Sequence, residues 1–210
     1  MLAATALAAG CAARGPRRFP AAGAEEARQA LLAWSEAVSR GASLSPSRLL
    51  YDARFGQGLF QSSGTLAVVE RGDSLSATLT GPFGAVVARY GGGVVEAQGA
   101  APLPLDGGTL RAILAGVWMG GTPRVAGCDA GDCLLRWEET EPVEAVLQVA
   151  AARLRTLRLA RHEGEILAAY SGAFAPWPER IEAEELRSGR KLRLHLLARE
   201  PLFAPGAQGR

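Results

Sequence analysis

Two segments far apart in the chain alternate polar and apolar residues, which is the pattern of a strand that buries one face. Residues 74–80 read Ser-Leu-Ser-Ala-Thr-Leu-Thr, and residues 191–198 read Lys-Leu-Arg-Leu-His-Leu-Leu-Ala. Turn signals rich in glycine separate other segments of similar character. Strands are expected over residues 49–56, 59–70, 74–80, 84–90, 93–98, 133–138, 143–150, 153–162, 165–171, 179–187 and 191–199. This run predicts an antiparallel sandwich or a barrel-like sheet.

Two further segments have the three-to-four-residue spacing of amphipathic helices. The first covers residues 25–40 and the second covers residues 109–119. Thr109 can cap the second helix, which lies between long flanks rich in glycine and proline. A lone apolar helix among strands predicts a lid or a plug on the sheet. Residues 143–160 also tolerate a helical pattern, so strand and helix remain open there.

The first eleven residues, MLAATALAAGC, form a small apolar run that ends in a cysteine. This ending resembles a bacterial lipobox, in which the peptide is cut before the cysteine and the cysteine is then lipidated. The basic segment that usually precedes such a run is absent, which indicates a start upstream of Met1. A frayed, Ala-rich terminus with a chance cysteine is the alternative. The expected organisation is a signal peptide over 1–10, lipidated Cys11 and a flexible tether over 11–24, one domain over 25–200, and a disordered tail over 201–210.

The other two cysteines, Cys128 and Cys133, enclose a short polar loop. In an exported protein, two cysteines this close readily form a disulfide, and we expect that bond here. The alternative is a metal site, but zinc needs about four ligands. His162 and His195 are not spaced to complete such a set, so no metal site is expected.

Composition and motifs argue against several classes of function. A net charge of +2 with 21% charged residues gives no clustered basic face for nucleic acid. The sequence contains no nucleophile motif, no phosphate-binding glycine loop and no plausible Cys/His pair. A histidine that acts as a general acid or base also needs a positioned partner. We therefore expect no nucleic-acid binding, no enzymatic activity and no cofactor.

The turn Gly81-Pro82-Phe83-Gly84 carries an aromatic side chain where turns are usually polar. Leaving such a side chain in water forgoes about 1.5–3 kcal/mol of burial free energy. Phe83 either folds back into the core at a barrel corner, or it is exposed and a membrane or an acyl chain covers it.

Several stretches together resemble the outer-membrane lipoprotein receptor LolB and its relatives with the LolA/LolB fold. The lipobox and tether precede a Trp-bearing helix, as in that family. Residues 79–84, Leu-Thr-Gly-Pro-Phe-Gly, are similar to the family's Leu-Thr-Asn-Pro-Leu-Gly. Residues 178–194 resemble its closing hairpin, in which a glycine turn precedes an alternating basic and apolar strand. Residues 110–116 are similar to its lid-helix region.

The resemblance implies a mainly β (α+β) fold, an incomplete antiparallel β-barrel of about eleven strands with helices covering the open face. The apolar interior of such a barrel holds the acyl chains of client lipoproteins. Candidates for the cavity lining are Leu75, Ala77, Leu79, Leu114 and Trp118, although the opposite face of residues 74–80 remains open as the concave one. By position, Phe83 stands where the family's leucine protrudes and touches the membrane. The expected membrane-inserting loop is therefore Gly81, Pro82, Phe83 and Gly84.

The same resemblance implies a monomeric receptor that takes lipoproteins from a LolA-like periplasmic carrier and inserts them into the outer membrane. Its lipid anchor would be Cys11. Ala12 is not the aspartate that favours retention in the inner membrane, so we expect the outer membrane, facing the periplasm. Two other functions remain open. One is a lipid-binding lipoprotein of the same fold that carries or senses another hydrophobic ligand, and the other is a structural envelope lipoprotein without a cavity function.

Overall fold

A computed structural model describes residues 18–42, 46–71, 74–91, 94–97, 103, 105–138, 141–162, 164–174 and 177–202 of the chain. The expected signal peptide, Cys11 with residues 12–17 of the expected tether, and residues 203–210 lie outside the described residues.

Strands make up most of the described structure, together with two helices. The helices are α1 (Ala24–Ala42) and α2 (Gly107–Ala115), and two short 3-10 helices are η1 (Pro82–Gly84) and η2 (Val149–Ala151). The strands are β1 (Ser47–Gln57), β2 (Phe60–Arg71), β3 (Ser74–Thr80), β4 (Val86–Gly91), β5 (Val94–Ala97), β6 (Arg124–Asp129), β7 (Asp132–Trp137), β8 (Val143–Gln148), β9 (Arg153–Arg161), β10 (Gly164–Phe174), β11 (Pro178–Glu185) and β12 (Arg190–Pro201).

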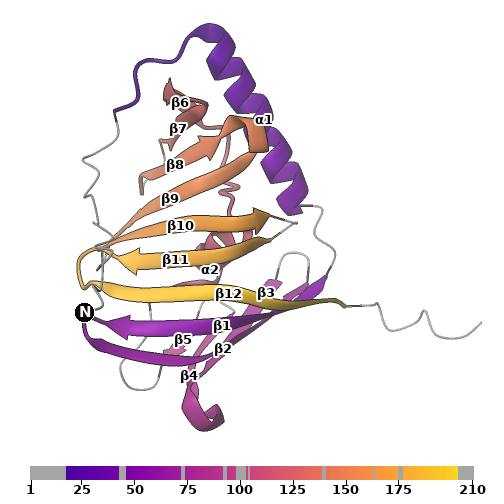
Figure 1. Cartoon of the computed structure of the whole chain (residues 1–210), viewed down its shortest axis with the longest axis vertical. Helices are drawn as coiled ribbons and strands as arrows, with labels where there is room; N and C mark the ends of the chain where they lie inside the picture. The colour runs from indigo at the N-terminus through magenta and orange to yellow at the C-terminus, as the bar shows by residue number, and fades with distance from the viewer. Residues whose placement is uncertain are drawn as a thin grey trace, which may run out of the picture.

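All twelve strands form one antiparallel sheet in the order β5-β4-β3-β2-β1-β12-β11-β10-β9-β8-β7-β6. The sheet curves strongly but does not close, because β5 and β6 remain its two edges (Figure 1). The first and last strands meet at its centre, where Ala53 of β1 is paired with Leu194 of β12. The expected fold, an incomplete antiparallel barrel with helices, is confirmed.

The structure adds one strand to the eleven segments expected from the sequence. Strand β6 reads Arg-Val-Ala-Gly-Cys-Asp, which has no polar and apolar alternation. Its pairing with β7 places Cys128 directly opposite Cys133. The ambiguous residues 143–160 form β8, η2 and β9 rather than a helix.

Helix α1 lies against one end of the sheet, beside β6 and β9 and against η2 (Figure 1). Small residues of α1 face the sheet: Ala30, Ala33 and Ala37 are buried. They allow close packing of the helix, and the ring of Trp34 meets Trp137 of β7 edge-on at 6.4 Å. Among the described helices, none is long and apolar enough to cross a membrane.

Helix α2 lies behind the middle of the sheet in Figure 1, on its concave side. It contacts β3 and β4 from one half of the sheet and β11 from the other. The helix begins where the carboxylate of Asp106 accepts a hydrogen bond from the Thr109 amide at 2.8 Å. It ends at Gly116, whose left-handed φ of 62° suits a residue without a side chain. The expected plug helix is therefore present, but Asp106 caps it rather than Thr109.

Candidate functional site

The concave side of the sheet is apolar, with aliphatic and aromatic side chains, and the cavity candidates lie on it. Leu75, Ala77 and Leu79 of β3 are all buried in the main hydrophobic core. They share one face of the strand because alternate residues point to the same side. Trp118, which lies just beyond α2 in the chain, is partly buried and packs against the same core. The structure thus brings all the predicted lining residues to one region, together with Leu114 from α2 itself.

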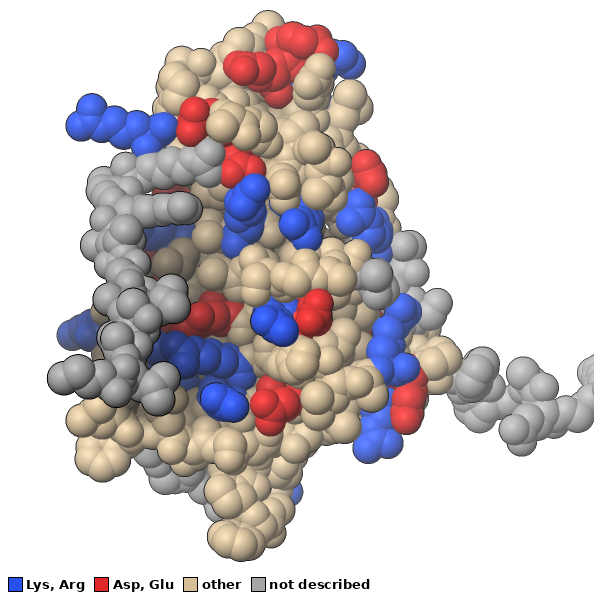
Figure 2. Space-filling model, in the orientation of Figure 1, with Lys and Arg blue, Asp and Glu red and all other residues tan. Residues whose placement is uncertain are grey.

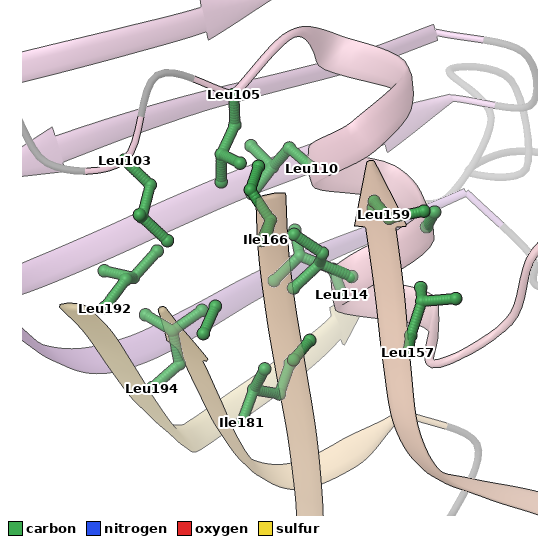
Figure 3. Packing of buried hydrophobic residues seen from close by; sticks show 14 of the residues in the cluster. Leu103, Leu105, Leu110, Leu114, Leu157, Leu159, Ile166, Ile181, Leu192 and Leu194 are labelled. Atoms are coloured by element: carbon green, nitrogen blue, oxygen red, sulfur yellow. The ribbon is translucent and has the colours of Figure 1, made fainter. Parts of the chain in front are cut away.

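Side chains of α2 fill this concave side. Leu110, Ile113 and Leu114 have no exposed surface, and neither has Leu79 of β3. Figure 3 shows Leu110 and Leu114 among leucine and isoleucine side chains of β9, β10, β11 and β12. Full burial means that solvent does not reach these four side chains. The hollow implied by the resemblance is therefore occupied by the chain's own helix in this structure.

A polar cluster holds the start of α2 at the rim of the sheet. Arg161, at the end of β9, donates from Nη1 to Glu141 Oε2 at 2.7 Å and from Nη2 to the hydroxyl of Thr109. The Thr109 hydroxyl in turn donates to Asp106 Oδ2 at 2.6 Å. Burial of Asp106 opposes its ionisation, but the Thr109 hydrogen bonds and the Arg161 charge outweigh that effect and lower its pKa. The cluster therefore stabilises α2 while Asp106 is ionised.

A second polar contact ties the middle of α2 to the other half of the sheet. Arg111 Nη2 lies 3.2 Å from Glu70 Oε1 of β2. Glu70 is almost fully buried, and its second oxygen, Oε2, has no hydrogen-bond partner among the described residues. Burial raises the pKa of Glu70, and the charges of Arg111 and Arg199 only partly offset this. Because burying this carboxylate costs free energy and one of its oxygens has no hydrogen-bond partner among the described residues, the ion pair contributes little net stability to the attachment of α2.

Four aromatic side chains in the core or packed against it have a buried polar atom without a partner in the described part of the chain. They are the Tyr51 and Tyr170 hydroxyls and the Trp34 and Trp177 indole nitrogens. Burial raises the pKa of both tyrosines, so both hydroxyls keep their protons and can donate. An unsatisfied buried donor costs about 1–3 kcal/mol. These groups therefore have hydrogen-bonding capacity that the packed interior does not use.

Two open hollows lie on the surface. One of about 420 Å³ lies beside α2 and is lined by residues that include Arg111, Trp118 and Arg161. The other, of about 630 Å³, lies over β1, β12, β11 and β10 and is lined by charged side chains that include Arg54, Glu182 and Arg193. Figure 2 shows mixed charges on this outer face, opposite α2. The chemistry of the outer hollow does not suit an acyl chain.

The turn that contains Phe83 projects from the sheet between β3 and β4. Phe83 is fully exposed, with a relative accessibility of 108%. Its φ of 62° is left-handed, a conformation that is rare for bulky residues. Gly81 N donates to Ala85 O at 2.8 Å, which closes the turn below the exposed ring. The side chain thus points away from the core.

The Cys128 and Cys133 sulfur atoms are joined in a disulfide with an S–S distance of 2.04 Å. The bond links β6 to β7 across the hairpin turn Ala130-Gly131. Ala30 of α1 packs against it. The disulfide thus supports the contact between α1 and an edge of the sheet, far from the rim of α2.

The comparisons with known proteins place this geometry among solved folds. No protein-family model matches the chain, and no curated protein is significantly similar to it. A LolA superfamily protein from Nitrosomonas europaea superposes with a TM-score of 0.53 at 11% identity, over 85% of this chain and 94% of that one. The fold is LolA-like. A domain assigned to outer-membrane lipoprotein sorting, from Vibrio parahaemolyticus, superposes with a TM-score of 0.50 at 13% identity, over 87% and 95% of the two chains.

The polar side chains that fasten α2 to the sheet, Glu70, Asp106 and Arg161, were not predicted from the sequence. Glu70, Asp106 and Arg161 come from three separate parts of the chain, and only the folded sheet brings the last two to one rim. Asp106 carried a recognisable signal, because an aspartate three residues before Thr109 is a helix cap. Glu70 carried none, since its strand gives no reason to expect a buried carboxylate.

Proposed function

We propose that the protein binds acyl chains on the concave side of its sheet, in the place that α2 now occupies. The observation that carries this proposal is an apolar concave face covered by a nine-residue helix of the same chain. That helix is fastened to the sheet rim by a few polar contacts, Arg161 with Thr109 and Arg111 with Glu70. Displacing α2 would uncover an apolar surface without unpairing any strand.

The exchange of α2 for an acyl chain is close to balanced in free energy. Burying Leu110, Ile113 and Leu114 contributes about 1.5–3 kcal/mol each, or about 5–9 kcal/mol together. Each buried methylene of a lipid contributes about 0.8 kcal/mol. About six to eleven methylenes therefore match the three side chains, and a longer acyl chain exceeds them. The free energy of uncovering the hollow would lower the apparent affinity for lipid, so a carrier with this design binds reversibly.

The unpaired donors support a ligand that has polar atoms as well as acyl chains. The ester and amide carbonyls of an acylated lipid or lipoprotein can accept hydrogen bonds from Tyr51, Tyr170 or Trp177. Such contacts would offset the cost of burying those groups. We therefore favour acylated molecules over plain hydrocarbons as ligands.

In its finer form, the proposal is a receptor that accepts lipoproteins from a LolA-like periplasmic carrier and inserts them into the outer membrane. Cys11 would supply the lipid anchor, facing the periplasm, and Phe83 would touch the bilayer during delivery. The LolA-like fold, the lipobox pattern and the exposed ring of Phe83 support this form. No covalent chemistry, nucleotide or metal is required, because the client passes between apolar environments.

A structural envelope lipoprotein without a ligand is the second candidate. The packed concave side favours it, because Leu79, Leu110 and Leu114 are fully buried without any ligand. Weakening α2 has a different effect under each candidate. A binding protein then gains affinity for lipid, whereas a structural protein only loses stability.

The test uses the full chain with Cys11→Ala and a fluorescent diacyl lipopeptide as the probe. Ile113→Ala removes apolar contacts of α2 and costs about 2–5 kcal/mol of packing. We expect the lipopeptide to bind Ile113→Ala at least tenfold more tightly than the parent protein, because the plug competes less well. Ala30→Gly, which weakens α1 in the separate core cluster, is the control. Absence of lipopeptide binding by both the parent protein and Ile113→Ala would leave the structural candidate.

A further inference from the structure

We infer that the β1–β2 hairpin tip, Leu59-Phe60, is a second point of contact with a lipid bilayer beside the turn of Phe83. The inference deepens the proposed function, because it names the surface that a membrane-delivering protein would turn toward its membrane. It is carried by the exposure of these side chains, by their place in the sheet and by the distribution of charge around them.

Strand topology puts the two turns on the same side of the sheet, at the ends of its strands. Strands β1 and β3 both pair with β2 in antiparallel fashion, so they run in the same direction and end on the same side. The β1–β2 tip comes directly after Gln57, and the Phe83 turn comes directly after Thr80. The two turns are offset along β2, because Thr80 pairs with Thr65 whereas Gln57 pairs with Phe60. Where β3 ends, a Cβ atom on Gly64 would lie 1.9 Å from the carbonyl oxygen of Thr80. Only glycine fits there.

The hairpin tip is as exposed as the turn of Phe83. Leu59 has a relative accessibility of 99% and Phe60 of 88%. Gly58 and Leu59 form a two-residue connection, in which Gly58 takes a left-handed φ of 57°. Such tight connections are usually polar, so two adjacent large apolar residues at this tip have no structural role.

Phe60 also lies on the concave face of the sheet. It lies on the same side of β2 as Leu66 and Val68, which are fully buried in the core, because residues of one parity point to one side. Phe55, on β1, lies between the two turns: its Cζ atom would be 4.0 Å from a Cβ on Gly81. The exposed tips thus extend the apolar concave surface to the ends of the strands.

Charge is absent from both tips along the sequence. No Asp, Glu, Lys or Arg lies between Arg54 and Glu70, and none lies between Asp73 and Arg89. Figure 2 shows the projecting lower end, where Figure 1 places the β3–β4 turn, without acidic or basic side chains. Charged groups are costly to bring out of water, so a surface meant to enter a bilayer excludes them.

The neighbouring turn supplies the complementary charge. Gln57 and Gly56 pair with Arg190 and Lys191 of β12, and the turn before them contains Arg187. Lys191 forms an ion pair with Glu184, with 3.1 Å between Nζ and Oε2, so part of this basic charge is already neutralised. Basic groups beside an apolar tip suit anionic headgroups. A bilayer fits this arrangement better than a protein partner, because each pointed tip can sink into lipid separately, whereas a protein interface needs a continuous area of about 800 Å² on each side.

The experiment measures flotation with vesicles of phosphatidylethanolamine and phosphatidylglycerol. All proteins are the full chain with Cys11→Ala, so every variant carries the same N-terminal residues and the ratios report the tips. We expect the partition coefficient to fall about tenfold for Leu59→Ser/Phe60→Ser, similarly for Phe83→Ser, and about a hundredfold when both are combined. Leu197→Ser, an exposed leucine in the half of β12 away from the tips, is the matched control and should bind normally.

Vesicle binding by Leu59→Ser/Phe60→Ser equal to that of the Leu197→Ser control would overturn the inference. A second outcome would also overturn it. If the parent protein self-associates, and Leu59→Ser/Phe60→Ser abolishes that association but leaves vesicle binding intact, the tip contacts a second copy of the chain and not a bilayer. Lipopeptide uptake by the same proteins separates this inference from the proposed function. If the protein takes up lipopeptide but the tip substitutions do not change vesicle binding, only the inference is wrong. If the tip substitutions weaken vesicle binding but the protein takes up no lipopeptide, only the proposed function is wrong.

Discussion

Arg111 on α2 and Glu70 on β2 form an ion pair, with 3.2 Å between Nη2 and Oε1, that joins the covering helix to one half of the sheet. The opposite half is joined through Arg161 and the Asp106 cap. The helix is therefore fastened on both sides of the hollow that it fills. The strength of these two fastenings determines how readily the concave face can be uncovered.

Replacing Glu70 by Gln should change how stability depends on pH. Burial raises the pKa of Glu70 above its ordinary value of 4.5, so the folded protein holds this proton more tightly than the unfolded chain does. That contribution to stability is complete below pH 4.5 and is lost as the pH rises through the folded pKa. We expect the free energy of unfolding of the parent protein, relative to Glu70→Gln, to fall as the pH rises from about 4 to 7. Urea unfolding at several pH values measures it, and a pH-independent difference would contradict the prediction.

Replacing Phe83 by Gly should stabilise the protein and slow its delivery of lipoproteins to membranes. The left-handed φ of Phe83 costs about 1 kcal/mol, which glycine avoids, and a fully exposed ring contributes little burial in return. We expect a rise of about 2–4 °C in Tm, together with slower delivery of lipoproteins to membranes. Phe83→Glu should also retain the fold and stall delivery. Normal delivery by both variants would remove Phe83 from the mechanism.

Replacing Asp106 by Ala should loosen α2 without unfolding the sheet. The change removes an N-cap that contributes about 1 kcal/mol, as well as the partner of the Thr109 hydroxyl. Hydrogen exchange of the amides in residues 107–115 should become several-fold faster, while exchange in β1 and β12 stays slow. Glu138→Ala, which removes an exposed partner of Arg124, serves as the control. Equal exchange in α2 for both variants would show that the cap does not hold the helix.

Removing the disulfide should lower stability by a modest amount and act locally. The bond between Cys128 and Cys133 closes a short loop, so chain entropy predicts a loss of about 2 kcal/mol for Cys128→Ser/Cys133→Ser. Because Ala30 of α1 packs on the bond, exchange should quicken in α1 and β6 but not in α2. Chemical unfolding and hydrogen exchange together measure this, and unchanged protection of α1 would argue against the link.

The architecture could be predicted because most strands expose one face. Segments such as β3 and the first half of β12 alternate cleanly, and the spacing of the turns then allows little but an antiparallel sheet. Strand β6 was not predicted from the sequence. It packs between α1 and β7, and it contains Gly127, whose missing side chain leaves room for the backbone of Pro20. A strand shaped by such a close approach carries no periodic signal.

The candidate site could be predicted only in part. Alternation placed Leu75, Ala77 and Leu79 on one face of their strand, but it left open which face is concave, and Leu114 came from the helix pattern. The occupation of the hollow by α2 could not be predicted, because periodicity shows which face of a helix is apolar but not what that face covers. The tip of Leu59 and Phe60 was hidden for a similar reason, since an apolar pair within a strand pattern looks like core until the hairpin turn is located.

The pairing of β1 with β12 has a consequence for how the chain folds. These two strands are joined by eleven residue pairs, as many as β1 shares with β2, yet about 140 residues separate their partners in sequence. A chain made from its amino terminus must keep one flank of β1 unmatched until almost the last strand has emerged. Bare strand flanks invite pairing with other molecules, so we expect newly made chains to depend on a holding chaperone, and a circularly permuted gene that makes β12 directly before β1 to fold faster and aggregate less.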